Sequence, residues 1–259
     1  MTILDKIVSF KKDEISRKKN ELLQVKKKVS KSSKRNHDFL AALKEPGLSI
    51  IAEFKRRSPS AGAIADDKEP EHQAVLFQKG GAGAVSVLTD AEFFGGTDQD
   101  IISVKKSVSI PVLRKDFIID ELQIYHSLFL GADAVLLIVR ILEFEKLKDF
   151  ISLVKKLGMD ALVEAHNLKE IETALKAGAE IIGINNRNLD TFNINTETSL
   201  KLKNNIPDSV LSVSESGVTK RGQVEQIEKY GFNGVLIGTS LMRSSDPEQF
   251  IKNLVRSRQ

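Results

Sequence analysis

The sequence predicts a single (β/α)8 TIM barrel in the α/β class, preceded by an N-terminal helical extension. Its 259 residues suit a barrel of this type, which typically needs about 250 residues to close. From residue 48 onward, short apolar runs alternate with amphipathic stretches eight times. Glycine-led segments also recur between helical patterns and the strands that follow them. We therefore expect residues 1–45 to form the extension and residues 46–259 to form the catalytic barrel.

The extension is the basic part of the chain. Residues 1–45 hold 13 Lys and Arg against 6 Asp and Glu, a net charge of +7, whereas the remainder carries −3. Such a run could bind nucleic acid. Apolar residues recur in it near helical spacing, however, which favours an amphipathic helix packed on a larger body with a solvated charged face. These residues are Leu4, Ile7, Val8, Ile15, Leu22 and Leu23. A flexible arm is the alternative.

The eight apolar runs are the predicted barrel strands. They are Leu48–Phe54, Ala84–Leu88, Ile110–Leu113, Ala134–Val139, Ala161–Val163, Ile181–Ile184, Val210–Val213 and Val235–Ile237. The intervals between them leave room for the crossover helix that each parallel connection requires.

A repeated glycine supports the count of eight strands. Gly81, Gly131, Gly178 and Gly231 each end a helical pattern and precede an even-numbered strand. Glycine readily takes the left-handed conformation that stops a helix. An open doubly wound sheet is the rival fold, but a dinucleotide-binding sheet would carry a glycine-rich loop after its first strand. No such fingerprint follows Phe54.

Composition excludes several classes of chemistry. The chain is 41% hydrophobic and 29% charged, as in ordinary globular domains, and it has no cysteine. A disulfide framework, a thiolate zinc site and a catalytic thiol are thereby excluded. The four histidines are widely spaced, so we expect no metal. No segment is apolar over the length of a membrane span, and we expect a cytoplasmic enzyme.

Charged and amide side chains occur at the ends of the predicted strands, where barrel active sites form. By the two-residue period of a strand, Glu53 and Lys55 share the inward face of Ile51 and should form an ion pair at the barrel mouth. The same count places these residues at the ends of strands three, five, six and seven: Lys115, Phe117, Glu164, Asn185, Arg187 and Glu215. Each alone could be solvated or structural. Together they indicate a shared acid–base site.

The last two strands end in small residues. Ser214-Glu215-Ser216-Gly217 and Gly238-Thr239-Ser240 would let a ligand approach backbone N–H groups. The seventh and eighth loops are the usual phosphate site of this fold. We therefore predict an anion there, with two ordinary glycine turns as the alternative.

Six motifs occur in order along the barrel. They are Ile51-Ala52-Glu53-Phe54-Lys55-Arg56-Arg57-Ser58-Pro59-Ser60, Leu113-Arg114-Lys115-Asp116-Phe117, Leu162-Val163-Glu164, Gly183-Ile184-Asn185-Asn186-Arg187-Asn188-Leu189, Ser214-Glu215-Ser216-Gly217 and Leu236-Ile237-Gly238-Thr239. In these motifs the chain resembles the indole-3-glycerol-phosphate synthase family from Ile51 to its C-terminus. The extension resembles that of the family by character rather than by motif. Ala61 and Thr239 depart from it, since a basic residue and a serine are more usual there.

The resemblance implies a carboxy-lyase of tryptophan biosynthesis that needs no cofactor. Its substrate would be a phosphorylated anthranilate derivative, 1-(2-carboxyphenylamino)-1-deoxyribulose 5-phosphate, closed to indole-3-glycerol phosphate with loss of carbon dioxide and water. No nucleic acid, membrane or obligate protein partner is implied. The aryl carbon can attack the ketone only if a cation protonates or polarises its oxygen.

The resemblance also implies a role for each site residue. Lys115 would be the acid of the ring closure, Glu164 the base or proton shuttle of the dehydration, and Lys55 a second cation and possible second acid. Glu53 and Glu215 would hold the lysines, and Asn185 and Arg187 would orient the substrate. Phe117 and Leu236 would pack on the anthranilate ring. The sugar and phosphate end would be lined by five small residues: Ser58, Ser216, Gly217, Gly238 and Thr239. Which lysine acts in which step, and the oligomeric state, stay open.

Three rival functions remain open. A related barrel, phosphoribosyl anthranilate isomerase, relies on a cysteine base, which this chain lacks. A Schiff-base aldolase would use Lys115 as its nucleophile. A nucleic-acid-binding module would use residues 1–45 and keep the barrel as a scaffold, with steeply salt-dependent binding.

Overall fold

Eight parallel strands close into a barrel at the centre of the computed structural model, which describes residues 2–29 and 38–255. The strands are β1 (Ser49–Phe54), β4 (Ala84–Leu88), β5 (Val112–Lys115), β6 (Ala134–Ile138), β7 (Asp160–Ala165), β8 (Ile181–Asn185), β9 (Leu211–Glu215) and β10 (Gly234–Ile237). Each follows its neighbour in the chain around the barrel, and β10 pairs with β1 to close it. The predicted (β/α)8 barrel is confirmed, and each predicted apolar run overlaps one strand. A small antiparallel hairpin, β2 (Arg57–Ser58) and β3 (Gly62–Ala63), lies in the loop after β1.

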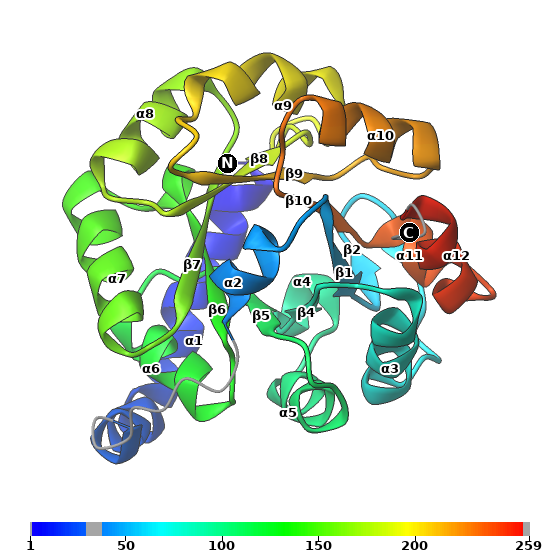
Figure 1. Ribbon diagram of the computed structural model, residues 1–259. Coiled ribbons are helices and arrows are strands. Elements are labelled where there is room, and N and C mark those ends of the chain that lie inside the picture. Colours follow the sequence, from blue (N-terminus) through cyan, green and yellow to red (C-terminus); the bar gives the residue numbers. More distant parts are fainter. Residues whose placement is uncertain (1, 30–37, 256–259) are drawn as a thin grey trace.

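Helices surround the barrel (Figure 1). The longer ones after β1 are α3 (Pro70–Gly80), α5 (Asp98–Ser107), α6 (Glu121–Phe129), α7 (Phe144–Lys156), α8 (Leu168–Lys176), α9 (Glu197–Leu202), α10 (Arg221–Lys229) and α12 (Pro247–Leu254). Short turns of helix occur in the loops: α4 (Ala91–Phe94), η1 (Val139–Ile141), η2 (Lys203–Asn205) and α11 (Thr239–Met242). The predicted helix-stopping glycines Gly81, Gly131, Gly178 and Gly231 all have positive φ, between 76° and 98°.

The two faces of each strand pack against different layers. On β1, Ile50, Ala52 and Phe54 belong to the core between the strands and the outer helices, whereas Ile51 belongs to the core inside the barrel. This alternation is the two-residue period of a strand. It carries Glu53, which is 3% exposed, toward the interior of the barrel.

The N-terminal segment contributes two helices. α1 (Ile3–Val29) packs beside α6, where Lys26 Nζ lies 2.6 Å from Glu121 Oε1. The helix buries Leu4, Ile7 and Leu22 from the predicted apolar stripe, but Leu23 is 39% exposed. Residue 1 and residues 30–37 of the expected extension lie outside the described residues. The division of the chain after residue 45 stays a prediction.

The second helix, α2 (Phe39–Lys44), covers the amino-terminal end of the barrel, facing the viewer in Figure 1. Its Phe39 and Leu43 are buried in the same core as Ile51 inside the barrel. Asp160, at the start of β7, accepts a hydrogen bond from the Leu40 amide at 2.9 Å. α2 therefore fills the end of the barrel opposite the carboxyl ends of the strands.

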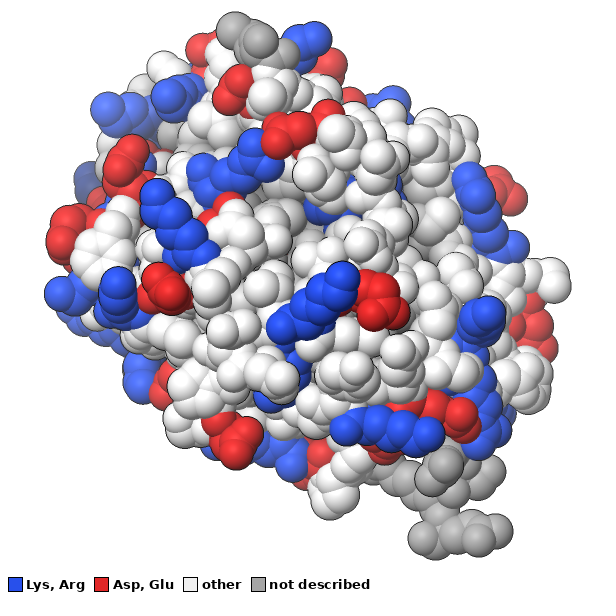
Figure 2. All heavy atoms as spheres, turned by 90° about the horizontal axis from the view of Figure 1, so that it is seen from above, with Lys and Arg blue, Asp and Glu red and all other residues white. Residues whose placement is uncertain are grey.

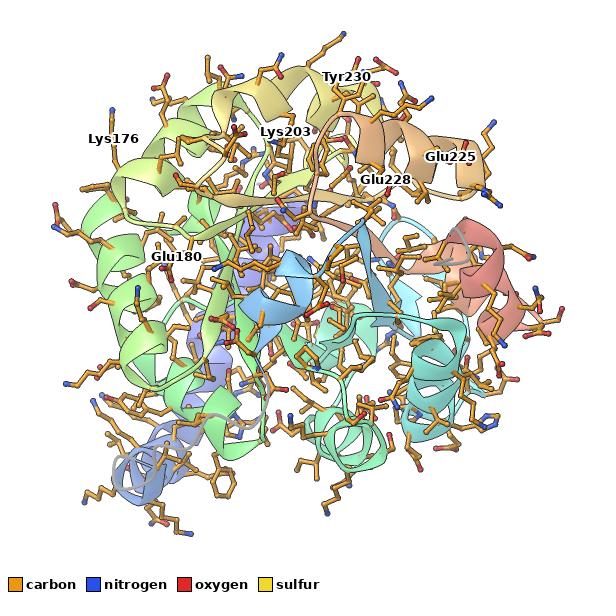
Figure 3. The ribbon with its side chains drawn as sticks, viewed as in Figure 1. Lys176, Glu180, Lys203, Glu225, Glu228 and Tyr230 are labelled. Carbon is orange, nitrogen blue, oxygen red and sulfur yellow. The ribbon has the colours of Figure 1, made fainter. Side chains whose placement is uncertain are left out.

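On the face that Figure 2 shows, basic and acidic side chains are interspersed, and no large patch of one charge sign is seen. Side chains such as Lys176 on α8 point away from the barrel (Figure 3). Within residues 2–29 and 38–255, no helix is both long and apolar enough to cross a membrane.

Candidate active site

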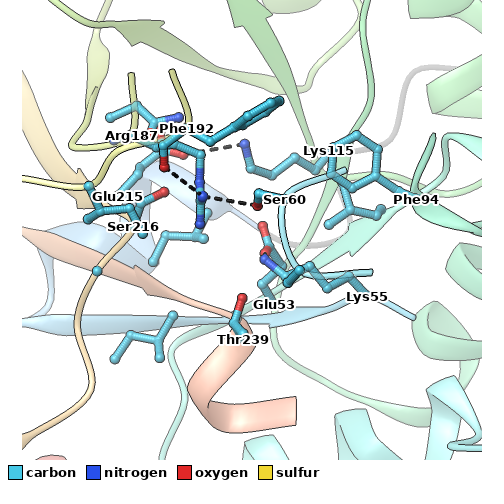
Figure 4. Close-up of a pocket in the computed structure, with 18 of the residues that line it drawn as sticks. Glu53, Lys55, Ser60, Phe94, Lys115, Arg187, Phe192, Glu215, Ser216 and Thr239 are labelled. Carbon is cyan, nitrogen blue, oxygen red and sulfur yellow. Dashed lines mark hydrogen bonds and ion pairs between the residues drawn. The ribbon is translucent and has the colours of Figure 1, made fainter. Parts of the chain in front are cut away.

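A cavity of about 660 Å³ opens at the carboxyl ends of the barrel strands. All of the predicted site residues except Ser58 line it, and Figure 4 shows how several of them converge from different strands. Ser58 instead lines a smaller neighbouring cavity of about 90 Å³ beneath the first turns of α1. The parallel strands bring these side chains together because they all end at the same rim of the barrel.

Lys115, at the end of β5, lies between two carboxylates. Its Nζ is 3.2 Å from Glu164 Oε2 on β7 and 3.4 Å from Glu215 Oε2 on β9. Burial opposes the charge on Lys115, but Glu164, Glu215 and Glu53 outweigh that effect and raise its pKa above the usual value. The lysine is therefore held as an ammonium that faces the cavity.

Glu215 is a buried carboxyl group with a strongly raised pKa. Its side chain is 1% exposed, and burial, with the nearby charges of Glu164 and Glu53, raises its pKa to about 7 despite the attraction of Lys115. Neither of its carboxylate oxygens has a hydrogen-bond partner among the described residues. A Cβ on Gly183 of β8 would overlap Glu215 Oε1, so this glycine makes room for the carboxylate. The buried oxygens can thus accept hydrogen bonds from a ligand, while Oε2 also lies within ion-pair distance of Lys115.

Glu164 is stabilised in the ionised form. Burial would raise its pKa, but Lys115 and then His166 lower it below the usual value. His166 Nε2 lies 3.4 Å from Glu164 Oε1, and its Nδ1 lies 3.2 Å from Glu170 Oε2. Although burial opposes the charge on His166, these two carboxylates raise its pKa. His166 was not among the predicted residues, although it lies two positions beyond Glu164; its imidazole contacts Glu164 and does not line the cavity.

The expected ion pair of the first strand is present. Lys55 Nζ lies 2.6 Å from Glu53 Oε1 at the cavity rim. A Cβ on Gly238, at the end of β10, would overlap Glu53 Oε1 and lie 2.9 Å from Lys55 Nζ. Glycine at this position therefore allows the ion pair to pack against the last strand.

Arg187 joins two loops across the rim. Its Nη1 donates to Ser60 Oγ at 3.0 Å and to the Phe192 carbonyl at 3.2 Å (Figure 4). The amide of Arg187 donates to Asn185 Oδ1 at 3.0 Å, which fixes the asparagine at the end of β8. A cation is therefore anchored above the cavity by the loops that follow β1 and β8.

Aromatic and aliphatic side chains form one wall of the cavity. The rings of Phe94 and Phe117 lie 6.0 Å apart, and Leu236 lines the cavity from β10. Phe94 was not among the predicted residues, because it lies six positions beyond the end of β4, in the short helix α4, where the strand period no longer applies. Together the rings can receive a flat apolar group.

The turns after β9 and β10 carry the small residues expected there. Ser216 has φ of 68° and Gly217 has φ of 94°, and both line the cavity with Thr239. A left-handed serine is uncommon, and such conformations concentrate at functional sites. Arg243, which follows α11, lines the same end and adds a cation that strand-end reasoning did not find. Across residues 2–29 and 38–255, no group of three or more His, Cys, Asp or Glu is placed to hold a metal ion.

The fold and the cavity define a (β/α)8-barrel enzyme whose site combines a cluster of acidic and basic side chains with an aromatic wall. Comparison with known proteins makes this specific: the family model for indole-3-glycerol phosphate synthase matches residues 4–254. The chain therefore belongs to the indole-3-glycerol phosphate synthase family, which consists of carboxy-lyases of tryptophan biosynthesis.

Individual relatives agree over nearly the whole chain. The indole-3-glycerol phosphate synthase of Lachnoclostridium phytofermentans is 44% identical over 266 residues, covering 97% of this chain and 98% of the relative. The same enzyme of Caldanaerobacter subterraneus subsp. tengcongensis is 46% identical over 254 residues, with 97% and 98% coverage. The predicted family is thus confirmed.

Solved structures of other activities share the fold. A thiamine phosphate pyrophosphorylase from Pyrococcus furiosus superposes with a TM-score of 0.61 at 14% identity, covering 84% of this chain and 96% of that one. An N-acetylmannosamine-6-phosphate 2-epimerase from Clostridium perfringens gives the same TM-score and identity, with 85% and 96% coverage. At this identity the likeness shows the barrel alone.

Proposed function

We propose that the chain closes 1-(2-carboxyphenylamino)-1-deoxyribulose 5-phosphate to indole-3-glycerol phosphate, with loss of carbon dioxide and water. The observation that carries the proposal is the buried Lys115 ammonium between Glu164 and Glu215. Family membership supports the reaction, and the biosynthetic role of the family supports a cytoplasmic location. The partner is a small phosphorylated substrate, and no cofactor takes part in the steps below.

Lys115 is the proposed acid of the ring closure. As the aryl carbon attacks the ketone, negative charge develops on the ketone oxygen, and a nearby ammonium can donate a proton to it. The raised pKa of Lys115 keeps the ammonium protonated until that charge appears. Lys55 is the proposed second cation, close to the carboxylate of the substrate.

The two buried glutamates take different roles because their environments differ. Glu164, whose pKa is lowered, is ionised and is the proposed base that removes the proton in the dehydration. Glu215, whose pKa is about 7 and whose oxygens accept no hydrogen bond from the described residues, is proposed to hold Lys115 by their ion pair and to bind a substrate hydroxyl. Glu53 would hold Lys55.

The remaining groups are proposed to bind the substrate. Asn185 and Arg187 would orient it and its carboxylate, and Phe117 and Leu236 would pack on the anthranilate ring. We place the phosphate at the turns after β9 and β10, on these residues: Ser216, Gly217, Gly238 and Thr239. Ser58 lies outside the main cavity, so its proposed contact with the sugar phosphate needs the loop after β1 to shift.

The rival functions find less support in the site. An aldolase nucleophile must be a neutral amine to form a Schiff base, whereas the surroundings of Lys115 raise its pKa. A nucleic-acid module would not account for the family match over residues 4–254, and one lysine of α1, Lys11, is buried in ion pairs rather than open to phosphate groups.

The direct test is a fluorescence assay for indole formation from the carboxyphenylamino substrate, with mass spectrometry of the product. We expect a product lighter than the substrate by one carbon dioxide and one water. The Lys115→Met variant controls for a contaminating synthase from the expression host. A folded chain that forms no product would overturn the proposal, and a stable adduct after borohydride reduction would favour the aldolase.

A further inference from the structure

Lys11 of α1 is buried, although it lies in a helix rich in exposed lysines. Its side chain is 3% exposed, and its Nζ lies 2.9 Å from Asp116 Oδ1 and 3.1 Å from Asp90 Oδ2. Glu14, one turn along the same helix, is 2.9 Å away. A lysine is rarely buried unless it is paired, so this ion cluster needs an explanation beyond the solvated face expected for α1.

The cluster lies directly behind the proposed acid. Asp116 follows Lys115 in the chain, and consecutive residues at the end of β5 point to opposite sides of the barrel wall. Lys115 therefore faces the cavity while Asp116 faces α1. The Thr89 amide, in the loop after β4, donates to the Lys115 carbonyl at 3.2 Å. The backbone that carries Lys115 is thus held at the point where Asp116 meets Lys11.

Asp116 is the residue that organises this loop. Its carboxylate accepts hydrogen bonds from Thr89 Oγ1 at 2.7 Å, from Arg114 Nη2 at 3.0 Å and from the Phe117 amide at 2.8 Å. Burial would raise the pKa of Asp116, but Lys11 and then Arg114 lower it. The carboxylate therefore fixes Phe117 through its amide, and it fixes Thr89, whose own amide holds the Lys115 carbonyl.

Lys11 is also the cation that lets two buried carboxylates lie together. The side chains of Asp90 and Asp116 are 0% and 1% exposed, and each raises the free energy of ionising the other. Among the described residues, Lys11 is the cation within ion-pair distance of Asp90. Removing one partner of a buried ion pair leaves an uncompensated charge, which is strongly destabilising.

We propose that Lys11 is a positioning residue for the synthase reaction: it holds Asp116 and Asp90 so that Lys115 and Phe117 keep their places in the cavity. This inference rests on the proposed role of Lys115. In this proposal α1 contributes to the reaction through the Lys11 ammonium, which does not line the cavity. Because the group it positions acts in the transition state, its loss should lower kcat more than it raises KM.

The experiment compares full-length variants with the indole fluorescence assay and thermal unfolding. We expect Lys11→Met to lower kcat by about tenfold to a hundredfold, the cost of a small misplacement of a catalytic group, with a KM change of less than about threefold. Lys11→Arg, which keeps the charge, should recover much of kcat. Lys18→Met is the matched control, because Lys18 is on the same helix, is 47% exposed and also contacts Glu14.

A second pair of variants separates positioning from stability. Asp90→Asn removes the charge that Lys11 would leave uncompensated, while Asn Oδ1 can still accept from the Phe93 amide as Asp90 does at 2.7 Å. The double variant Lys11→Met with Asp90→Asn should fold even where Lys11→Met does not. Its kcat should remain at least about fivefold below that of Asp90→Asn alone, because Asp116 still lacks Lys11.

The outcomes are distinct. Normal kcat in folded Lys11→Met, or equal kcat in the double variant and Asp90→Asn, would overturn the positioning role while leaving the synthase function intact. Absence of activity in the unaltered chain and in Lys18→Met would instead overturn the proposed function, and with it this role of Lys11.

Discussion

Lys115 and Glu164 meet across the mouth of the barrel, with Nζ and Oε2 3.2 Å apart, although they are separated by 49 positions in the chain. The ammonium and the carboxylate that we assign to opposite proton transfers are therefore in contact before a substrate enters. Each stabilises the charged form of the other: Glu164 raises the pKa of Lys115, and Lys115 lowers that of Glu164. A substrate bound in the cavity would lie against both Lys115 and Glu164, since both line it. We therefore expect both groups to contribute to turnover.

Lys115→Met should fold but lose two to four orders of magnitude in kcat, roughly the range of a lost general acid. Methionine keeps most of the length and the apolar stem of the lysine. Steady-state kinetics with circular dichroism of the variant checks this. Near-normal kcat in the folded variant would refute the assignment of Lys115 as the acid.

His166→Gln should move the acidic limb of the kcat/KM profile to higher pH. The imidazolium beside Glu164 lowers the pKa of that carboxyl, so its removal makes the proposed base harder to ionise. The pH profile of kcat/KM measures the shift directly. His72→Gln on α3 is the control, since His72 is exposed. An acidic limb that coincides in all three proteins would show that His166 does not influence the base.

Glu215 should make the folded chain less stable as pH rises. Its pKa is raised from 4.5 to about 7, so between these values the folded chain binds the proton more tightly than the unfolded chain. The resulting stability is complete below pH 4.5 and is lost as pH approaches 7. Urea unfolding across this range should show a shallower decline in Glu215→Gln than in the unaltered chain.

The control for this pH series is Glu172→Gln, which changes an exposed glutamate on α8. It should leave the decline unchanged. If Glu215→Gln and the unaltered chain have parallel curves from pH 4.5 to 7, the buried carboxyl is not the group that titrates.

Gly238→Val should weaken binding of phosphorylated ligands far more than it lowers the melting temperature. The new side chain would overlap Glu53 Oε1 and crowd the proposed phosphate turn. Calorimetric titration with inorganic phosphate and the KM for the substrate are the measurements. Gly222→Ala, on α10, is the control because an added Cβ there meets no atom within 4 Å. Unchanged phosphate affinity in Gly238→Val would move the phosphate to another part of the cavity.

Phe39→Ala should destabilise the fold without slowing the chemistry. Phe39 is 0% exposed inside the amino-terminal end of the barrel, and such a truncation costs roughly 3–5 kcal/mol of unfolding free energy. The cavity lies at the other end, so kcat of the folded fraction should stay within about twofold. Denaturant unfolding and kinetics test both parts, with the exposed Lys44→Ala as control. A large fall in kcat would show that the two ends are coupled.

The fold was predictable because each local signal pointed to the same barrel: apolar runs of strand length, helix-stopping glycines and the spacing between them. The ends of the strands were less well predicted. The runs ended at Leu113, Val163 and Val213, whereas β5, β7 and β9 continue to Lys115, Ala165 and Glu215. Apolar patterning ends where charged residues begin. Here the backbone of charged residues such as Lys115 and Glu215 still pairs in the barrel, while their side chains line the cavity.

The site was predictable where its residues lie at strand ends, and it was missed where contacts come from elsewhere. Phe94 and Arg243 reach the cavity from loop positions well beyond the strand ends, where the two-residue period gives no guide. Lys11 could not be separated from the other lysines of α1, since its burial depends on carboxylates about eighty or more positions away. Ser58 was placed by motif alone, and the loop that carries it turns toward α1.

The alternation along β5 makes its register unusually consequential. Arg114, Lys115 and Asp116 present a cation outward, a cation inward and an anion outward in three consecutive positions. A slip of one residue during folding would exchange every inward side chain for an outward one. It would place either the Arg114 guanidinium or the Asp116 carboxylate in the cavity, and it would leave the Lys115 amine facing α1 and α6. Misaligned chains would therefore be both unstable and inactive. The charges that are proposed to act in the reaction thus also destabilise a shifted register of β5.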